Sequence, residues 1–290
     1  MIRILVLGLV VSVAAGCTTA PPEEPDVAAV DDLKLPFDAY KPAPGQRALL
    51  NTAHRALVAR CLKRRGVKPR TPLPAAPVDP GNSRRYGVAD PEQARLYGYH
   101  LPTETPSRAK KARRVKGQIE RALYGPDGCE EQAAARLGAS DRAPWRWLVR
   151  RDARTLERSA ERPGVRDAVA RWAECMKAAG HPYPSPEAAI GDSRWDLEKP
   201  AISDDEKRTA VADATCKWSS GLVSRWHAAD AALQRKLVHK HAGRFALLRT
   251  DLNERVQRAT AILERHRSAK QKDAAHPDTT EPQRSPEHQG

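Results

Sequence analysis

The chain has 290 residues, and its 50 Lys and Arg against 36 Asp and Glu give a formal net charge of +14. The length suits one large domain or two small ones, and with only 5% aromatic residues the core must come mainly from Ala, Leu, Val and Trp. The only long apolar run lies at the N-terminus and no Gly-X-Y period occurs, which excludes a multi-span membrane protein and collagen.

Residues 1–16, MIRILVLGLVVSVAAG, have the pattern of an export signal peptide. Arg3 precedes an apolar stretch from Ile4 to Val13, and small residues follow directly before Cys17. This stretch is shorter than the roughly 20 residues that a transmembrane helix needs. We therefore expect the chain to be exported.

The four residues Ala14-Ala15-Gly16-Cys17 resemble the lipobox of bacterial lipoproteins, although Ala14 stands where that family usually has Leu or Val. The resemblance implies that the Cys17 thiol carries a diacylglycerol and that the new amino terminus carries an acyl chain such as palmitate. It places the protein on the extracytoplasmic face of the cell membrane, held by its lipid anchor. A plain secreted protein and an uncleaved anchor are the alternatives.

A region rich in Pro and acidic residues, 17–45, follows the signal peptide. It has no apolar periodicity, and such a composition does not bury enough surface to fold. We expect a disordered tether that leads to a helical domain over 46–267. The polar segment 268–290 is expected to be a disordered tail.

Apolar residues recur every three or four positions through most of 46–267, which predicts helices and no strands. Gly66 is placed to end the first helix, Asp90-Pro91 to start a second, and Ser203 with Glu206 has the spacing of a capping box. The predicted helices are 46–65, a short one from 90, 107–123, 129–137, 141–161, 165–179 and about 204–267; the Pro-containing segments 67–82 and 182–200 are predicted loops.

The segment 204–267 lacks Pro and is the longest predicted helix, although Gly221 is a possible break. Four apolar residues in it lie 11 positions apart: Trp226, Leu237, Leu248 and Ala259. An 11-residue period favours a nearly straight or slightly right-handed pairing of helices. Two interpretations fit: a long helix laid across the core of its own chain, or a homodimer through this helix.

Four cysteines remain if Cys17 is lipidated: Cys61, Cys129, Cys175 and Cys216. In an exported protein an even number indicates disulfides, here two. No two of the four have the short spacing of a zinc site, so we expect neither a metal nor another cofactor. Four cysteines allow three pairings.

An internal similarity favours one pairing. The chain reads ALVARCLKRRGVKPRTP around Cys61 and AVARWAECMKAAGHPYPSP around Cys175, in both cases an Ala-rich helix that stops soon after the Cys. Cys129 and Cys216 each stand near the start of an apolar periodic run. Two copies of one unit, 46–137 and 165–233, predict the disulfides Cys61–Cys129 and Cys175–Cys216, although an Ala- and Arg-rich chain can produce such a similarity by chance.

The expected fold class is therefore all-α, an irregular helical bundle of two Cys-paired units with a long C-terminal helix. Its positive charge gathers in a basic patch on the predicted helix 107–123, formed by Arg108, Lys110, Lys111, Arg113, Arg114 and Lys116. A second cluster reads Trp145-Arg146-Trp147 and Arg150-Arg151.

Such basic surfaces attract anionic lipid head groups and acidic wall polymers, which are the partners we expect in the cell envelope. A solvated surface without a dedicated partner is the alternative. We expect no nucleic-acid partner, because no helix-turn-helix, zinc-finger or RNA-binding signature accompanies the charge.

Three of the six Tyr lie in the segment 86–100, which marks it as a candidate binding loop. Its candidate binding residues are Tyr86, Tyr97, Tyr99 and His100. The alternative is that these residues pack the loop onto the helices. No catalytic motif for a serine, zinc or nucleotide-dependent enzyme occurs, so no catalytic residue is named and an enzyme is not expected.

Two further segments, Trp172–Gly180 and Ala212–Lys217, contain the patterns C-M-x-x-x-G and D-x-x-C-K. With the tyrosine segment they resemble uncharacterised actinobacterial exported lipoproteins, a resemblance that covers about 46–223 and implies no known activity; Cys61-Leu62 departs from the Cys-Met form. The expected function is a structural or interaction role in the bacterial cell envelope. A wall-polymer or small-molecule binding module that uses 86–100 is the second hypothesis, and an envelope hydrolase the third.

Overall fold

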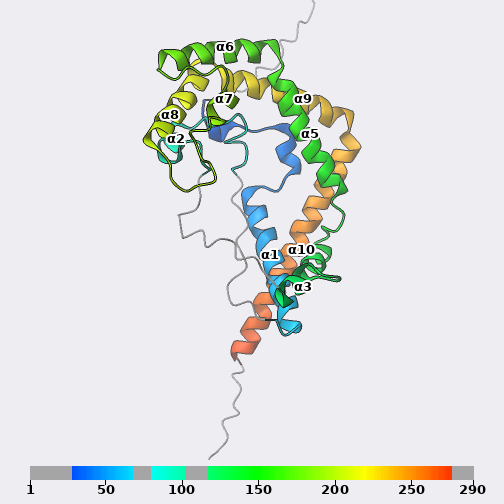
Figure 1. Cartoon of the computed structure of the whole chain (residues 1–290). Helices are drawn as coiled ribbons and strands as arrows, with labels where there is room; N and C mark the ends of the chain where they lie inside the picture. Colours follow the sequence, from blue (N-terminus) through cyan, green and yellow to red (C-terminus); the bar gives the residue numbers. More distant parts are fainter. Residues whose placement is uncertain (1–27, 68–79, 102–116, 276–290) are drawn as a thin grey trace, which may run out of the picture.

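The computed structural model describes residues 28–67, 80–101 and 117–275, and these contain helices and no strand (Figure 1). The elements are the 3-10 helices η1 (Val30–Asp32) and η2 (Pro36–Tyr40) and the α-helices α1 (Pro44–Arg64), α2 (Pro91–Tyr97), α3 (Gln118–Tyr124), α4 (Cys129–Arg136), α5 (Ala143–Ala160), α6 (Pro163–Ala178), α7 (Pro186–Ile190), α8 (Asp204–Ser219), α9 (Leu222–Lys240) and α10 (Ala242–Ala275). The predicted all-α irregular bundle is confirmed.

The helices gather into two groups, one at each end of the molecule, and the two groups are joined along one side (Figure 1). At one end α2, α6, α7 and α8 surround a core that includes Trp172 and Met176 of α6 and Leu222 of α9. At the other end α1, α3 and α4 share a second, smaller core. Helix α5 and the consecutive helices α9 and α10 connect the two ends, and α10 packs along α1.

Each end contains one of the two predicted disulfides, and both pairings are confirmed. Cys61 of α1 joins Cys129 of α4, with Cα atoms 5.6 Å apart, and Cys175 of α6 joins Cys216 of α8, with Cα atoms 5.7 Å apart. The predicted position at a helix start holds for only one of the two cysteines Cys129 and Cys216. Cys129 is the first residue of α4, as predicted, but Cys216 lies near the end of α8 and does not open a helix.

The prediction of a disordered tether over 17–45 is wrong from residue 28 onward. Leu33, Leu35 and Phe37 are buried, and the Phe37 ring packs against that of Phe245 with centroids 5.1 Å apart. The backbone N–H of Phe37 also donates to Gln234 Oε1 at 2.9 Å. Three apolar side chains in a Pro- and acid-rich segment suffice to fix it, because the helices offer a cavity that they fill. The signal peptide, Cys17 and the rest of the tether lie outside the described residues.

The predicted long helix 204–267 is three helices. Gly221 adopts φ +71 between α8 and α9, the left-handed conformation that glycine tolerates best, so the possible break is real. A second break lies at His241, where one helix was expected to continue, and α10 extends beyond the predicted boundary at 267 to Ala275. The tail is therefore helical over 268–275.

The four apolar residues that lie 11 positions apart face the core of their own chain. Trp226, Leu248 and Ala259 are buried and Leu237 is half-buried, against partners from η2, α1 and α5. The interpretation of a helical segment laid across the core of its own chain fits this packing. Homodimerisation through these residues stays a prediction.

Other predicted boundaries shift by small amounts. Pro163 starts α6, because proline is well suited to the first helical turn, and the predicted loop 182–200 contains the short helix α7. Of the predicted helix 107–123, only the part from Gln118 onward belongs to the described residues, as the start of α3. The basic patch 108–116 lies outside them.

The start of α8 shows half of the predicted capping box. Ser203 Oγ accepts from the backbone N–H of Glu206 at 3.1 Å, but the Glu206 carboxylate turns away to the segment 98–100. We expect Ser203→Ala to lower the free energy of unfolding by about 1 kcal/mol, because one N–H of the first turn loses its acceptor. Urea unfolding measures this, with Ser193→Ala, in an exposed loop, as the control; equal losses in the two variants would contradict the capping role.

Candidate functional site

The first candidate site is a buried ion pair within α8. Lys217 Nζ lies 2.8 Å from Asp213 Oδ2, and each side chain is 1% exposed. Lys217 Nζ also donates to the Val88 carbonyl at 2.9 Å, and Trp172 Nε1 donates to Asp213 Oδ1 at 2.9 Å. A Cβ on Gly87 would lie 2.8 Å from Lys217 Nζ, so a glycine is needed where the segment passes over the amine.

Burial dominates the electrostatics of this pair. It raises the pKa of the Asp213 carboxyl and lowers the pKa of the Lys217 ammonium, while the attraction between the two groups acts against both shifts. The pair therefore ties the segment 87–89 to α8 through charged groups that are isolated from solvent. The D-x-x-C-K pattern contains both residues and its spacing of four puts them on one helix face, but the pattern does not reveal that they form a buried pair.

A second buried cluster surrounds Asp230 of α9. Its carboxylate accepts from Arg85 Nε at 2.6 Å, from Tyr86 OH at 3.2 Å and from Gln234 Nε2 at 3.2 Å. Burial, followed by the charge of Asp230, raises the pKa of Tyr86 far above its usual value. Tyr86, a candidate binding residue, thus fastens the loop to α9 through its hydroxyl.

The other candidates of the loop are partly used in packing. Tyr99 is buried and stacks on Trp195 at 6.1 Å between centroids, and its backbone N–H donates to Glu206 Oε1 at 2.9 Å. Tyr97 is half-buried on α2. The structure thus places two of the three tyrosines in the core.

His100 meets a carboxylate that the sequence could not place. Its Nδ1 lies 2.9 Å from Glu206 Oε1, and its Nε2 lies 2.9 Å from the Lys199 carbonyl. Both ring nitrogens therefore have a protein partner. Neither ring nitrogen is left to face a ligand, so the arrangement holds the segment 98–100 in place. His181, by comparison, contacts the hydroxyl of Thr209 at 3.1 Å.

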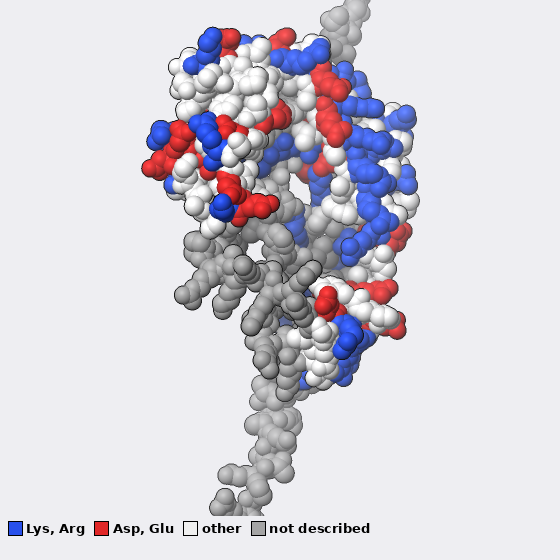
Figure 2. Space-filling model, viewed as in Figure 1, with Lys and Arg blue, Asp and Glu red and all other residues white. Residues whose placement is uncertain are grey.

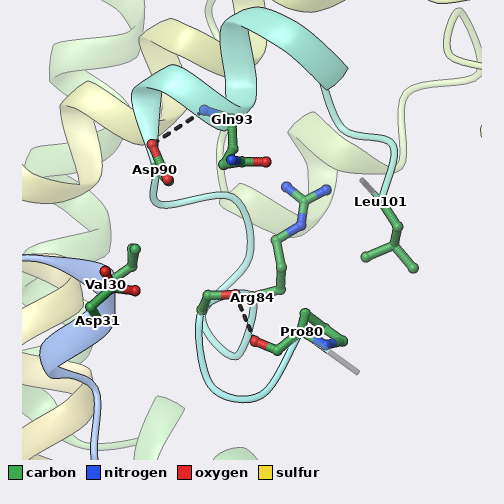
Figure 3. A pocket seen from close by; sticks show the side chains of 8 residues that line it. Val30, Asp31, Pro80, Arg84, Asp90, Gln93 and Leu101 are labelled. Atoms are coloured by element: carbon green, nitrogen blue, oxygen red, sulfur yellow. Dashed lines mark hydrogen bonds between the residues drawn. The ribbon is translucent and has the colours of Figure 1, made fainter. Parts of the chain in front are cut away.

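Several cavities border the segment 80–101, and two of them are each lined by several of its residues. One, of about 210 Å³, contains the Arg84 side chain between η1 and α2 (Figure 3). Its lining residues are Val30, Asp31, Pro80, Ser83, Arg84, Asp90, Gln93 and Leu101. Arg84 Nη2 donates to the Tyr99 carbonyl at 3.0 Å, and burial lowers the pKa of its guanidinium. Gln93 Oε1 is buried and has no hydrogen-bond partner among the residues described.

The other cavity, of about 330 Å³, lies between α5, α7 and α9. Tyr86 and Trp226 form part of its wall, and atoms of Lys217 and Asp213 also border it. Both cavities have the combination of apolar walls and a few polar groups that small ligands use.

The second basic cluster of the sequence forms a positively charged face. Lys and Arg side chains gather over α5 and the adjoining α9 and α10 (Figure 2). Four exposed arginines follow one another at a spacing of four residues along α5: Arg146, Arg150, Arg154 and Arg158. None of them forms an ion pair with a described carboxylate, and like charges at this spacing repel one another.

A buried tryptophan, Trp147, packs on the core side of this face. Trp147 packs in the core between α5 and α10, edge-on to Phe245 at 5.3 Å between centroids. Arg244 of α10 lies 4.7 Å from its ring centroid and Arg151 lies 5.6 Å away. These cation–π contacts hold two guanidinium groups beside the arginine row. Of the two cluster tryptophans, only Trp145 is exposed, at 40%.

Other kinds of site are not found in the described part of the chain. No group of three His, Cys, Asp or Glu side chains there could hold a metal ion. No helix among the same residues is long and apolar enough to cross a membrane. No family model, curated protein or solved structure matches the chain, so the resemblance to exported lipoproteins stays a prediction.

Proposed function

We propose that the chain is an exported lipoprotein, held by Cys17 on the extracytoplasmic face of the cell membrane, where it acts through non-covalent contacts in the envelope. The two disulfides carry this proposal. Each one joins helices within one of the two ends of the fold, and disulfides persist in oxidising compartments outside the cytoplasm. The short apolar leader before Cys17 supports the same location.

The first packed residues of the chain lie close in sequence to the proposed anchor. Leu33, Leu35 and Phe37 are buried against the helices. Fifteen residues, 18–32, separate Cys17 from Leu33. Even fully extended, a segment of this length spans only about 50 Å, which keeps the helices near the membrane surface.

Mass spectrometry of the membrane fraction tests the proposal. We expect the mature protein to begin at Cys17, with a diacylglycerol on its thiol and acylation of its new amino terminus. The protein should remain in the membrane fraction at high salt, since at least two acyl chains hold it firmly. Cys17→Ala is the control and should accumulate with its leader attached. An unmodified Cys17 in the wild-type protein would refute the lipid anchor.

A second candidate function is the binding of a wall polymer fragment or another small molecule. The cavity around Arg84 supports it, because a guanidinium and Gln93 Oε1, which has no partner among the described residues, line the same small space (Figure 3). Arg84 donates and the Gln93 carbonyl accepts, which suits a polar ligand such as a sugar. Thermal-shift measurements with soluble wall fragments test this candidate, with Gln93→Leu as the variant that should lose the response.

A further inference from the structure

We infer that the exposed face of α5, together with the adjoining end of α9, is a membrane-contact surface that binds anionic lipid head groups. The inference rests on the proposed location at the membrane. It specifies which surface of the protein faces the bilayer and which chemistry holds it there.

The cations form a row along α5. Arg146 and Arg158 are twelve residues apart, so the row on α5 is about 18 Å long. Lys236 and Lys240 of α9 are exposed as well, without an ion pair to a described carboxylate, and α9 packs against α5. Figure 2 shows many Lys and Arg side chains on this side of the molecule, with a smaller group of acidic side chains beside them.

Few acidic groups offset these charges. Asp152 of α5 lies 2.8 Å from Lys41 Nζ and 3.0 Å from Arg85 Nη2, so its charge is already matched by two cations. Asp230 of α9 is buried and paired with Arg85. Glu157 is the exposed carboxylate of α5. The face therefore keeps a net positive charge that an anionic surface can neutralise.

Two apolar side chains distinguish a bilayer from a soluble polyanion as the partner. Trp145 and Val149 are 40% and 47% exposed and lie one turn apart on α5, beside Arg146 and Arg150. A tryptophan next to arginines is typical of the membrane interface, where the ring enters the head-group region and the cations meet phosphates. A hydrated wall polymer gives such side chains no apolar environment.

Vesicle binding tests this inference. The protein is made from Thr18 onward, so that the leader and Cys17 are absent and every described residue is kept. We expect it to sediment with vesicles that contain phosphatidylglycerol, to bind phosphatidylcholine vesicles much more weakly, and to lose affinity as salt is raised. Because this protein carries no lipid, the result is independent of whether Cys17 is lipidated in cells.

Matched double variants separate a specific face from general attraction. Arg150→Gln with Arg154→Gln should lower the affinity for anionic vesicles about thirtyfold, because each near-surface cation contributes about tenfold or somewhat less. Arg166→Gln with Lys177→Gln removes the same charge from exposed positions of α6 and should change it less than twofold. Trp145→Ala should lower the affinity about fivefold and make the remainder more sensitive to salt.

Three outcomes would overturn the inference. Equal losses in the two double variants would show diffuse attraction, and equal binding to both kinds of vesicle would show that the anionic head group plays no part. Binding to purified anionic wall polymer that depends on Arg150 and Arg154, with no binding to vesicles, would assign the face to the wall. Failure of lipidation at Cys17 would leave all three measurements unchanged.

Discussion

Asp213→Asn is expected to lower the free energy of unfolding at neutral pH by about 3 kcal/mol, because it leaves the Lys217 ammonium buried without its counter-charge. The hydrogen bond from Trp172 can still reach the amide oxygen, so the loss reports mainly on charge. Urea unfolding at pH 7 measures it. Asp196→Asn is the matched control: it removes the carboxylate of an exposed pair with Lys199 and should leave the unfolding midpoint almost unchanged.

The pH dependence of the Asp213→Asn variant provides a second readout. Burial already lowers the pKa of Lys217 in the folded wild-type protein, and removing Asp213 takes away the attraction that opposes this shift. The unfolded chain then binds more protons than the folded chain up to about pH 10, so the variant gains stability as the pH rises from 7. If the variant instead lost stability relative to the wild-type protein as the pH rises from 7 to about 10, this explanation would be contradicted.

A double variant separates the cost of an unpaired buried charge from the cost of altered packing. Adding Lys217→Met to Asp213→Asn removes the unpaired charge and should restore most of the lost stability, since apolar or neutral replacements of a buried pair are often close to neutral. The Val88 carbonyl loses its donor in this variant, and segment 87–89 should show faster amide exchange. No recovery in the double variant would show that packing at this position outweighs charge.

Loss of either disulfide is expected to cost about 4 kcal/mol of stability. The Cys175–Cys216 bridge spans 41 positions and the Cys61–Cys129 bridge spans 68, and a cross-link over loops of this size restricts the unfolded chain by that amount. Cys175→Ala with Cys216→Ala, and Cys61→Ala with Cys129→Ala, remove each bridge without leaving a free thiol. Chemical denaturation of both double variants measures the two losses.

The position of each bridge predicts where the structure loosens. Without Cys61–Cys129, amide exchange should increase mainly in α1, α3 and α4, which share the smaller core. Without Cys175–Cys216, it should increase in α6 and α8. Reductant should lower the unfolding midpoint of the wild-type protein; an unchanged midpoint would mean that the bridges add nothing to stability.

Local patterns in the sequence predicted most of the helical elements. Apolar spacing located α1, α5 and α6, and the N-cap Asp90 with Pro91 marked the start of α2. The internal similarity also predicted the pairing of the cysteines, although Cys216 lies near the end of α8 and does not open a helix. These signals succeed because a helix is decided by residues within one or two turns of one another.

The sites depend on contacts between distant residues, which no local pattern encodes. His100 and Glu206 are 106 positions apart, Arg85 and Asp230 are 145 apart, and Phe37 reaches Gln234 across 197. Composition alone assigned the segment around Phe37 to a tether, whereas the packing of η2 against α9 and α10 buries its apolar side chains.

The sequence by itself determined the helices, the two disulfides and the excess of positive charge. Only the tertiary structure decided which charges are buried in pairs and which arginines of α5 remain on the surface, because helix packing selects the face that each helix loses from solvent.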